Sequence, residues 1–178
     1  MKDLGITKGE WMKEIKLTQG KVALVDDEDY ELVSQKTWYT RRDYSTCYAI
    51  SHGPKIKGVQ KTIFMHNFIM DPPNGMEVDH IDRNGLNCQR ANLRYGTHQQ
   101  NCMNQRPKNG AKYKGVILTK DGYICAAIRI NGKYKHLGSF PTEELAALAY
   151  DEVAFKYYGE FAYLNFKHES IITKAEER

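Results

Sequence analysis

An aspartate and a histidine stand side by side at Asp79 and His80, in a run whose apolar and polar residues alternate as in a β-strand. Neighbouring strand residues point to opposite faces, so the two side chains can serve different roles around one site. A carboxylate is a hard oxygen ligand suited to Mg²⁺, and a neutral imidazole can take a proton from water near neutral pH. Asn101 follows on an expected helix, and its amide oxygen could complete the site. Phosphodiester hydrolysis requires these parts, although an isolated Asp-His pair also fits an ordinary polar surface.

The elements that must position these residues follow the order strand, loop, strand, helix. Residues 76–82 alternate as a strand, and residues 92–96 form a second short strand. Thr97 is the expected N-cap of a helix through Asn104. Before them, residues 63–70 have helical apolar spacing and end at a run with two prolines.

A longer pattern surrounds the Asp-His pair. The chain carries His66, then Val78-Asp79-His80-Ile81-Asp82, Asn84-Gly85-Leu86-Asn87, Ala91-Asn92-Leu93-Arg94 and Asn101. This pattern resembles the HNH endonuclease family and is most similar to phage and intron-associated homing endonucleases. The resemblance implies a ββα-metal fold that holds one divalent ion.

The resemblance also implies roles for single residues. By matching position, His80 would be the general base, and Asp79 and Asn101 would bind the metal. Asn92 would hold the loop that orients His80. The third motif letter is Asn101 instead of a histidine. This favours Mg²⁺ or Mn²⁺ over zinc, because an amide oxygen is a harder ligand than imidazole.

Several features near the motif have two interpretations. His66 either contacts phosphate or packs in a helix, and His98 either lines the site or is solvated. Cys88, His98 and Cys102 could form a structural zinc site, although the chain has no Cys-x-x-Cys pair. The acidic run over residues 26–29 either binds a metal or starts a solvated helix, the commoner role of such a run.

Charge is unevenly distributed in the second half of the chain. The 26 basic and 22 acidic residues leave a net charge of +4, too small to name a partner. Residues 106–140 carry eight basic residues against one acid, whereas residues 141–160 carry five acids against one lysine. A module with one positive face attracts a polyanion such as nucleic acid, although a solvated surface gives the same pattern.

Three strand-like runs, separated by Asp121-Gly122 and Asn131-Gly132 turns, precede a helix of strong helix formers that opens at Pro141 and runs through Tyr158. Residues 112–166 resemble the AP2 DNA-binding domain. The residues that carry this resemblance are Lys112-Tyr113-Lys114-Gly115-Val116, Ala126-Ala127-Ile128-Arg129, His136-Leu137-Gly138-Ser139-Phe140, the helix from Glu143 to Asp151, and Leu164-Asn165-Phe166. It implies a three-stranded antiparallel sheet laid in the DNA major groove and backed by one helix.

By family position, six residues of this module would meet DNA: Lys114, Arg129, Tyr134, His136, Ser139 and Tyr150. Arg129 is the best candidate to read a base edge, since guanine is the usual target of an arginine fork, and Lys114 fits a phosphate contact. Ile117, Ala127 and His136 depart from the family pattern. The target sequence of relatives therefore does not carry over.

The sequence thus predicts an α+β protein with a ββα-metal nuclease module, an AP2-type three-stranded antiparallel sheet with one packing helix, and a small mixed N-terminal region. We expect that α+β region over 1–60, the nuclease over 61–105, a linker over 106–111, the AP2-like domain over 112–166 and a tail over 167–178. The N-terminal region would either extend the DNA contact through Arg41, Arg42, Lys55 and Lys57 or only brace the nuclease.

The expected function is that of a homing-endonuclease-like enzyme that hydrolyses double-stranded DNA with Mg²⁺ or Mn²⁺ and without a small-molecule cofactor. The alternative is a non-catalytic DNA-binding or regulatory protein with a vestigial nuclease fold; a structural RNA-binding protein fits only the charge. The sequence has no apolar run long enough to span a membrane and no secretory signal. We therefore expect a monomer or homodimer in the cytoplasm of a bacterial or phage-infected cell.

Overall fold

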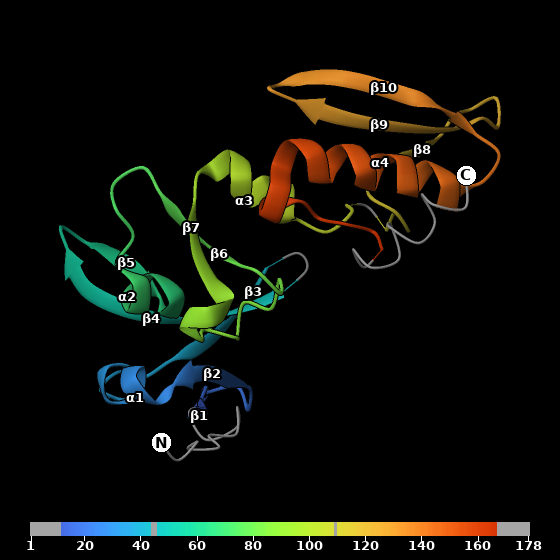
Figure 1. Ribbon diagram of the computed structural model, residues 1–178. Coiled ribbons are helices and arrows are strands. Elements are labelled where there is room, and N and C mark those ends of the chain that lie inside the picture. Colours follow the sequence, from blue (N-terminus) through green and yellow to red (C-terminus); the bar gives the residue numbers. More distant parts are fainter. Residues whose placement is uncertain (1–11, 44–45, 109, 167–178) are drawn as a thin grey trace, which may run out of the picture. The chain divides into compact units, whose positions relative to one another are not determined.

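The structure is a computed structural model, and it describes residues 12–43, 46–108 and 110–166. The chain divides into two compact units, Met1–Asn101 and Cys102–Arg178. Each unit mixes small antiparallel sheets with few helices (Figure 1). The tail expected over 167–178 lies outside the described residues.

The first unit begins with a hairpin and a short helix. Strands β1 (Met12–Lys16) and β2 (Val22–Asp26) pair antiparallel, and Gly20 supplies the positive φ of +72° that their turn requires. Helix α1 (Asp27–Ser34) follows directly, with three acidic residues in its first turn. Negative charge there is favourable because the helix dipole is positive at that end.

A three-stranded antiparallel sheet comes next, in the order β3 (Tyr39–Asp43), β4 (Thr46–Ile56) and β5 (Val59–Phe64). The sequence His52-Gly53-Pro54 lies inside β4, where the pairing with β5 shifts register between His52 and Lys55. Such an irregularity explains why a proline, which has no backbone N–H, is accepted within a strand.

The elements around the Asp-His pair follow the predicted order. Helix α2 (Met65–Met70) leads to β6 (Glu77–His80), and a 3₁₀ turn (Arg90–Asn92) leads to β7 (Leu93–Gly96) and α3 (His98–Asn104). Strands β6 and β7 form a two-stranded antiparallel sheet. Thr97 caps α3 as predicted: its Oγ1 accepts from the backbone N–H of Gln100 at 3.3 Å, and Oε1 of Gln100 accepts from the backbone N–H of Thr97 at 2.8 Å.

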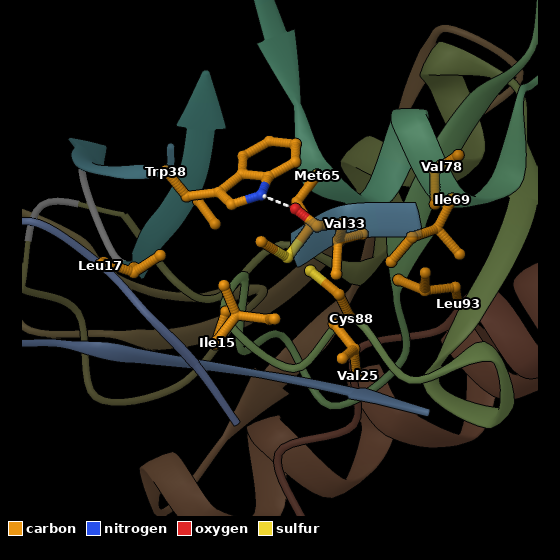
Figure 2. Close-up of a cluster of buried hydrophobic side chains, with 12 residues drawn as sticks. Ile15, Leu17, Val25, Val33, Trp38, Met65, Ile69, Val78, Cys88 and Leu93 are labelled. Atoms are coloured by element: carbon orange, nitrogen blue, oxygen red, sulfur yellow. Dashed lines mark hydrogen bonds between the residues drawn. The ribbon is translucent and has the colours of Figure 1, made fainter. Parts of the chain in front are cut away.

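One hydrophobic core joins the N-terminal hairpin to strands β6 and β7 (Figure 2). Trp38 is almost fully buried in it, and its indole N–H donates to the carbonyl of Val33 at 2.8 Å. Val25, Met65 and Leu93 enter the same cluster from three distant parts of the sequence. The boundary expected between residues 60 and 61 falls within β5, and the segments on both sides of it share this core.

The second unit is a three-stranded antiparallel sheet with one helix packed on it (Figure 1). Strands β8 (Val116–Leu118), β9 (Ile124–Ile130) and β10 (Lys133–Phe140) lie in the order β10-β9-β8, and α4 (Glu143–Tyr158) runs into a 3₁₀ turn (Gly159–Phe161). Ile128 packs against Tyr150 and Ala154 of α4.

A buried polar network closes this second unit. The carboxylate of Asp151, fully buried on α4, accepts bonds from the backbone N–H groups of Asn165 and Phe166 and from the Asn165 side chain, each at 2.9 Å. Asn165 in turn accepts from the backbone N–H of Lys114 at 2.7 Å. Residues 165 and 166 are thereby hydrogen-bonded to α4 and, through Asn165, to Lys114, which lies just before β8.

Candidate active site

The register of β6 and β7 sets the faces of the candidate site. Asp79 lies opposite Arg94, and His80 lies opposite Leu93. Directly opposed residues share a face of the sheet and alternate residues of a strand do too. Glu77, Asp79 and Arg94 therefore lie on one face, while the His80 side chain leaves β6 from the other.

Asp79 is held by an ion pair. Its side chain is nearly buried, and Arg94 donates to its Oδ2 from Nε at 2.9 Å and from Nη2 at 2.7 Å. Removing either partner of such a buried pair would leave the other charge uncompensated. Arg94 is part of the sequence pattern, but the pattern gives it no role; strand register is the signal that could have found its pairing with Asp79.

Asn101 reaches the same face from α3. Its Nδ2 donates to Oε2 of Glu77 at 2.8 Å, and the other Glu77 oxygen lies 2.9 Å from Nδ1 of His98. The hydrogen bonds from Asn101 and His98 lower the pKa of Glu77. Glu77, also missed from the sequence, thus fixes the Asn101 amide two residues along β6 from Asp79.

His80 is buried within a cluster of rings. Its ring centroid lies 5.7 Å from that of Tyr48 and 4.7 Å from that of His66. Burial lowers the pKa of His80 to about 4, so the imidazole is neutral at physiological pH. The neutral form is the one that can accept a proton, and a phosphate brought beside it would raise this pKa.

His66, left open from the sequence, belongs to the same cluster. Its ring lies 5.3 Å from that of Phe64, and its Nδ1 is buried without a hydrogen-bond partner among the described residues. Burial lowers the pKa of His66 to about 3. The structure therefore places a second neutral imidazole against His80.

Asn92 ties together the loop that follows His80. Its Oδ1 accepts from the backbone N–H of Asp82 at 2.9 Å, and its Nδ2 donates to Oδ1 of Asp82 at 2.9 Å and to the Asn87 carbonyl at 2.8 Å. The Asn92 carbonyl accepts from Ile81 at 2.9 Å. These contacts can orient His80 through the backbone that leaves it.

The same loop also packs closely against β4 at Gly85. A Cβ built on Gly85 would lie 2.5 Å from the ring of Tyr48 and 2.6 Å from the carbonyl of Cys47. Those distances are too short for any other residue without movement of the loop or of β4. Tyr48 therefore contacts both His80 and the loop after it.

The acidic run over residues 26–29 braces this loop. Asp29 receives Arg90 Nε at 2.8 Å and Nη2 at 2.7 Å, and Asp26 accepts from the Arg90 backbone N–H at 2.7 Å. Leu24 adds two backbone bonds, to Leu86 and from Cys88, each at 2.8 Å. Of the two interpretations of the run, the structure shows a helix start whose carboxylates also hold the 84–92 loop.

The oxygen donors fit a hard divalent cation in type. Asp79 has a carboxylate that can bind a metal. The amide oxygen of Asn101 can bind one too, because only the Nδ2 of that amide is bonded to Glu77. All-oxygen donors suit Mg²⁺ or Mn²⁺. Arg94 already neutralises Asp79, so a cation would have to share or displace that pair. Across residues 12–43, 46–108 and 110–166, no group of three His, Cys, Asp or Glu side chains is arranged to hold a metal, the Cys88–His98–Cys102 set included.

The second unit presents a face of its sheet away from α4, which we call the outer face. Register places Arg129 opposite Tyr134, and Ala127 opposite His136. Ser139 lies opposite Cys125, with their oxygen and sulfur atoms 3.4 Å apart. Four of the six expected DNA contacts are exposed on this outer face: Arg129, Tyr134, His136 and Ser139.

Lys114 and Tyr150 are placed differently. The Lys114 ammonium donates to the carbonyls of Met103 at 2.6 Å and Gln105 at 2.7 Å. Tyr150 is buried beneath Gly115, where a Cβ would lie 1.9 Å from its ring. Both side chains make internal contacts of the second unit. The resemblance did not reveal this, because the internal partners come from distant segments.

The basic residues of 106–140 also do not gather on one face. Lys112 pairs with Glu144 at 2.9 Å, and Lys135 faces the α4 side, where its ammonium lies 5.9 Å from the Tyr157 ring. Arg129 is the cation that strand alternation assigns to the middle of the outer face.

Two antiparallel strands with an Asp-His pair, a loop tied by an asparagine and a following helix with a second asparagine define a ββα nuclease-type module. The HNH endonuclease family model matches residues 71–103, the segment that contains these elements. An uncharacterized HNH endonuclease of Acanthamoeba polyphaga mimivirus is 32% identical over 146 residues, which cover 81% of this chain and 74% of that protein. The chain belongs to the HNH endonuclease family.

A different protein matches part of the chain. The dehydration-responsive element-binding protein 2E of Oryza sativa subsp. japonica is 48% identical over 65 residues, which are 35% of this chain and 20% of that protein. No solved structure matches the chain.

In the described part of the chain, no helix has the length and apolar character needed to cross a membrane.

Proposed function

We propose that the protein is a divalent-metal-dependent endonuclease of the homing type, which hydrolyses phosphodiester bonds of double-stranded DNA. One observation carries the proposal: a neutral, buried His80 leaves β6 next to Asp79, and the loop after it is tied by Asn92. A base held in this way and a neighbouring set of oxygen donors are the parts that metal-assisted hydrolysis needs.

In the proposed reaction, His80 takes a proton from a water molecule whose oxygen bonds to phosphorus. The bond from phosphorus to the 3′ oxygen breaks, and the 3′ oxygen takes a proton from solvent water, which leaves a 5′ phosphate and a 3′ hydroxyl. Asn92 and Tyr48 keep the His80 ring in place during this step. Asp79 and Asn101 would hold the cation, which when bound supplies positive charge for the phosphate and the leaving oxygen.

Recognition of a longer DNA site falls, in this proposal, to the outer face of the second unit, acting as an AP2-type sheet in the major groove. The exposed Arg129 and Tyr134 on opposed positions of β9 and β10 support it. So does the partial match to a rice protein whose name describes it as a dehydration-responsive element-binding protein. The cytoplasmic location expected from the sequence stays a prediction.

A nicking assay tests the proposal. We expect the protein to convert supercoiled DNA of mixed sequence to nicked or linear forms with Mg²⁺ or Mn²⁺, and not with EDTA. His80→Ala should lower the rate by about 10²–10⁴-fold, because a general base contributes this much, while duplex affinity stays within about threefold. Equal loss of cleavage and affinity would contradict the role of His80.

The alternative, a non-catalytic DNA-binding protein, is favoured by one feature. The Asp79–Arg94 pair neutralises the carboxylate expected to bind the cation. If Arg94 stays on Asp79 whatever the metal concentration, no cleavage should appear at any Mg²⁺ or Mn²⁺ level while duplex binding persists. The same nicking assay, run as a metal titration beside a binding measurement, separates the two functions.

A further inference from the structure

Strand β3 carries two adjacent arginines that point to opposite faces of its sheet. Arg41 lies opposite Tyr48 of β4, and Arg42 lies opposite Cys47. Both arginines are exposed. The two are chemically identical and differ only in the side of the sheet from which they extend.

The Arg41 side is the side of the ring cluster around His80. The Arg41 guanidinium carbon lies 5.6 Å from the centroid of the Phe64 ring. That ring lies 5.8 Å from Tyr48 and 5.3 Å from His66, and both of these rings contact His80. A continuous set of ring contacts therefore connects Arg41 to the proposed base.

Arg41 is available for an external anion. Among the described residues it makes no ion pair with a carboxylate, in contrast to Arg90 and Arg94. The guanidinium carbon of Arg41 lies over the Phe64 ring, and the five N–H groups of an arginine are arranged in a planar fork. These groups match the oxygens of a phosphate in a bidentate contact.

The charge of the surrounding segment supports an anionic ligand. Residues 39–64 carry five basic residues and one acid, whereas residues 12–38 carry four basic residues and six acids. The sheet that bears Arg41 is therefore the basic part of the first unit, and the acidic part is used to brace the loop at Arg90.

We infer that Arg41, supported on Phe64, binds a backbone phosphate of the DNA strand that His80 cuts. This inference rests on the proposed function and gives β3 a role beyond bracing. Contact with a phosphate next to the reacting one would position the strand over His80. Contact with the reacting phosphate would also stabilise its developing charge.

The test compares Arg41→Gln with Arg42→Gln as the matched control. Binding is measured on a mixed-sequence duplex in the cleavage-inactive His80→Ala background, as a function of salt. Affinity falls as salt rises, and each phosphate contact makes the slope of log affinity against log salt more negative by about 0.9. Arg41→Gln should therefore make the slope less negative by about one. Arg42→Gln should leave it unchanged, and Arg41→Lys should retain it because the charge remains.

Cleavage gives the second readout. With His80 intact and enzyme in excess, Arg41→Gln should slow cleavage by about 10- to 100-fold, since an oriented charged donor at a reacting phosphate contributes on this order. Arg42→Gln should slow it less than about threefold, and thermal unfolding should show both variants folded.

The outcomes separate the inference from the proposed function. Equal effects of Arg41→Gln and Arg42→Gln on slope and rate, with a wild type that cleaves, would overturn the role of Arg41 alone. A wild type that neither binds nor cuts duplex DNA with Mg²⁺ or Mn²⁺ would overturn both. Loss specific to Arg41→Gln, with retention of the slope in Arg41→Lys, supports the inference.

Discussion

The nuclease motif and the outer face of the second unit use their polar side chains in opposite ways. In the motif, polar groups are held by other side chains: Asp79 by Arg94, Asn101 by Glu77, and Asn92 by Asp82. On the outer face, Arg129 and Tyr134 are exposed, and the buried polar groups of that unit, Asp151 and Asn165, fasten its fold. Chemistry requires groups fixed in advance, whereas contact with a duplex tolerates side chains that settle on binding.

The largest effect is expected when a side chain that holds a site residue of the motif is removed. Glu77→Ala frees the Asn101 amide and should slow Mg²⁺-dependent cleavage by about 10- to 100-fold, the usual effect of losing a group that orients a metal ligand. The Mg²⁺ concentration for half-maximal rate should rise in parallel. Duplex affinity should change by less than about threefold, because Glu77 lies on the motif and not on the outer face.

Two controls accompany that measurement. Glu77→Gln keeps one oxygen acceptor for Asn101, so it should recover part of the rate. Glu31→Ala removes an exposed acid from α1 and should leave the metal requirement unchanged. A slower Glu77→Ala enzyme with an unaltered Mg²⁺ requirement would mean that Glu77 only supports the fold.

A substitution on the outer face should have the opposite effect: weaker duplex binding with an unchanged cleavage rate. Arg129→Ala should weaken duplex binding by about tenfold, since a base or phosphate contact of an arginine is worth about 1–3 kcal/mol. Cleavage at saturating DNA should keep its rate, because Arg129 is not in the motif. Lys133→Ala is the control: an exposed cation of the same sheet whose register position opposite Ile130 is on the α4 side. Equal losses in the two variants would indicate diffuse attraction instead of a binding face.

Acid sensitivity of the fold is a separate expected effect and belongs to the motif. The pKa of His66 is lowered to about 3 in the folded protein by burial, against 6.5 for an ordinary histidine. Below pH 6.5, His66 binds a proton in the unfolded chain but stays neutral in the folded protein. The free energy of unfolding that this residue contributes is therefore fully present above pH 6.5 and decreases as the pH falls toward 3. The loss is about 1.4 kcal/mol per pH unit for this histidine.

Urea unfolding of the metal-free protein between about pH 7.5 and 4.5, a range that brackets the ordinary histidine pKa of 6.5, would measure this loss. His66→Phe keeps a ring in the cluster without a titrating group, so its stability should fall less steeply with acid. His136→Gln, on the exposed outer face, should follow the wild type. A wild-type slope in His66→Phe would contradict the burial of a neutral His66.

Local patterns were sufficient to predict much of the secondary structure. Alternation found β6, the Asn131-Gly132 turn separated β9 from β10, and Thr142 begins α4 as a capped helix, accepting from Leu145 at 3.2 Å. Residues 39–50 alternate aromatic and polar residues as a single strand would, but they divide between β3 and β4. Alternation alone cannot show where a chain reverses without a strong turn signal.

The partners of the site residues could not be predicted in the same way. Asp79 meets Arg94 through strand register, and His80 meets Tyr48 across more than thirty positions of sequence. Tyr150 looked like a surface contact by family position, yet its ring fills the space beneath Gly115. Side-chain partners depend on which distant elements pack together, and local spacing carries no record of that. The roles assigned to His80, Asp79, Asn101 and Asn92 remain predictions.

The contacts of Asp26 and Asp29 with Arg90 limit how far this nuclease can be shortened. A chain that began at residue 61 would lose both carboxylates, the backbone bonds from Leu24 and the buried indole of Trp38. The smallest portable cutting module is therefore set by the first hairpin and not by the recognisable motif, and any fusion to a foreign DNA-binding partner must carry that hairpin along.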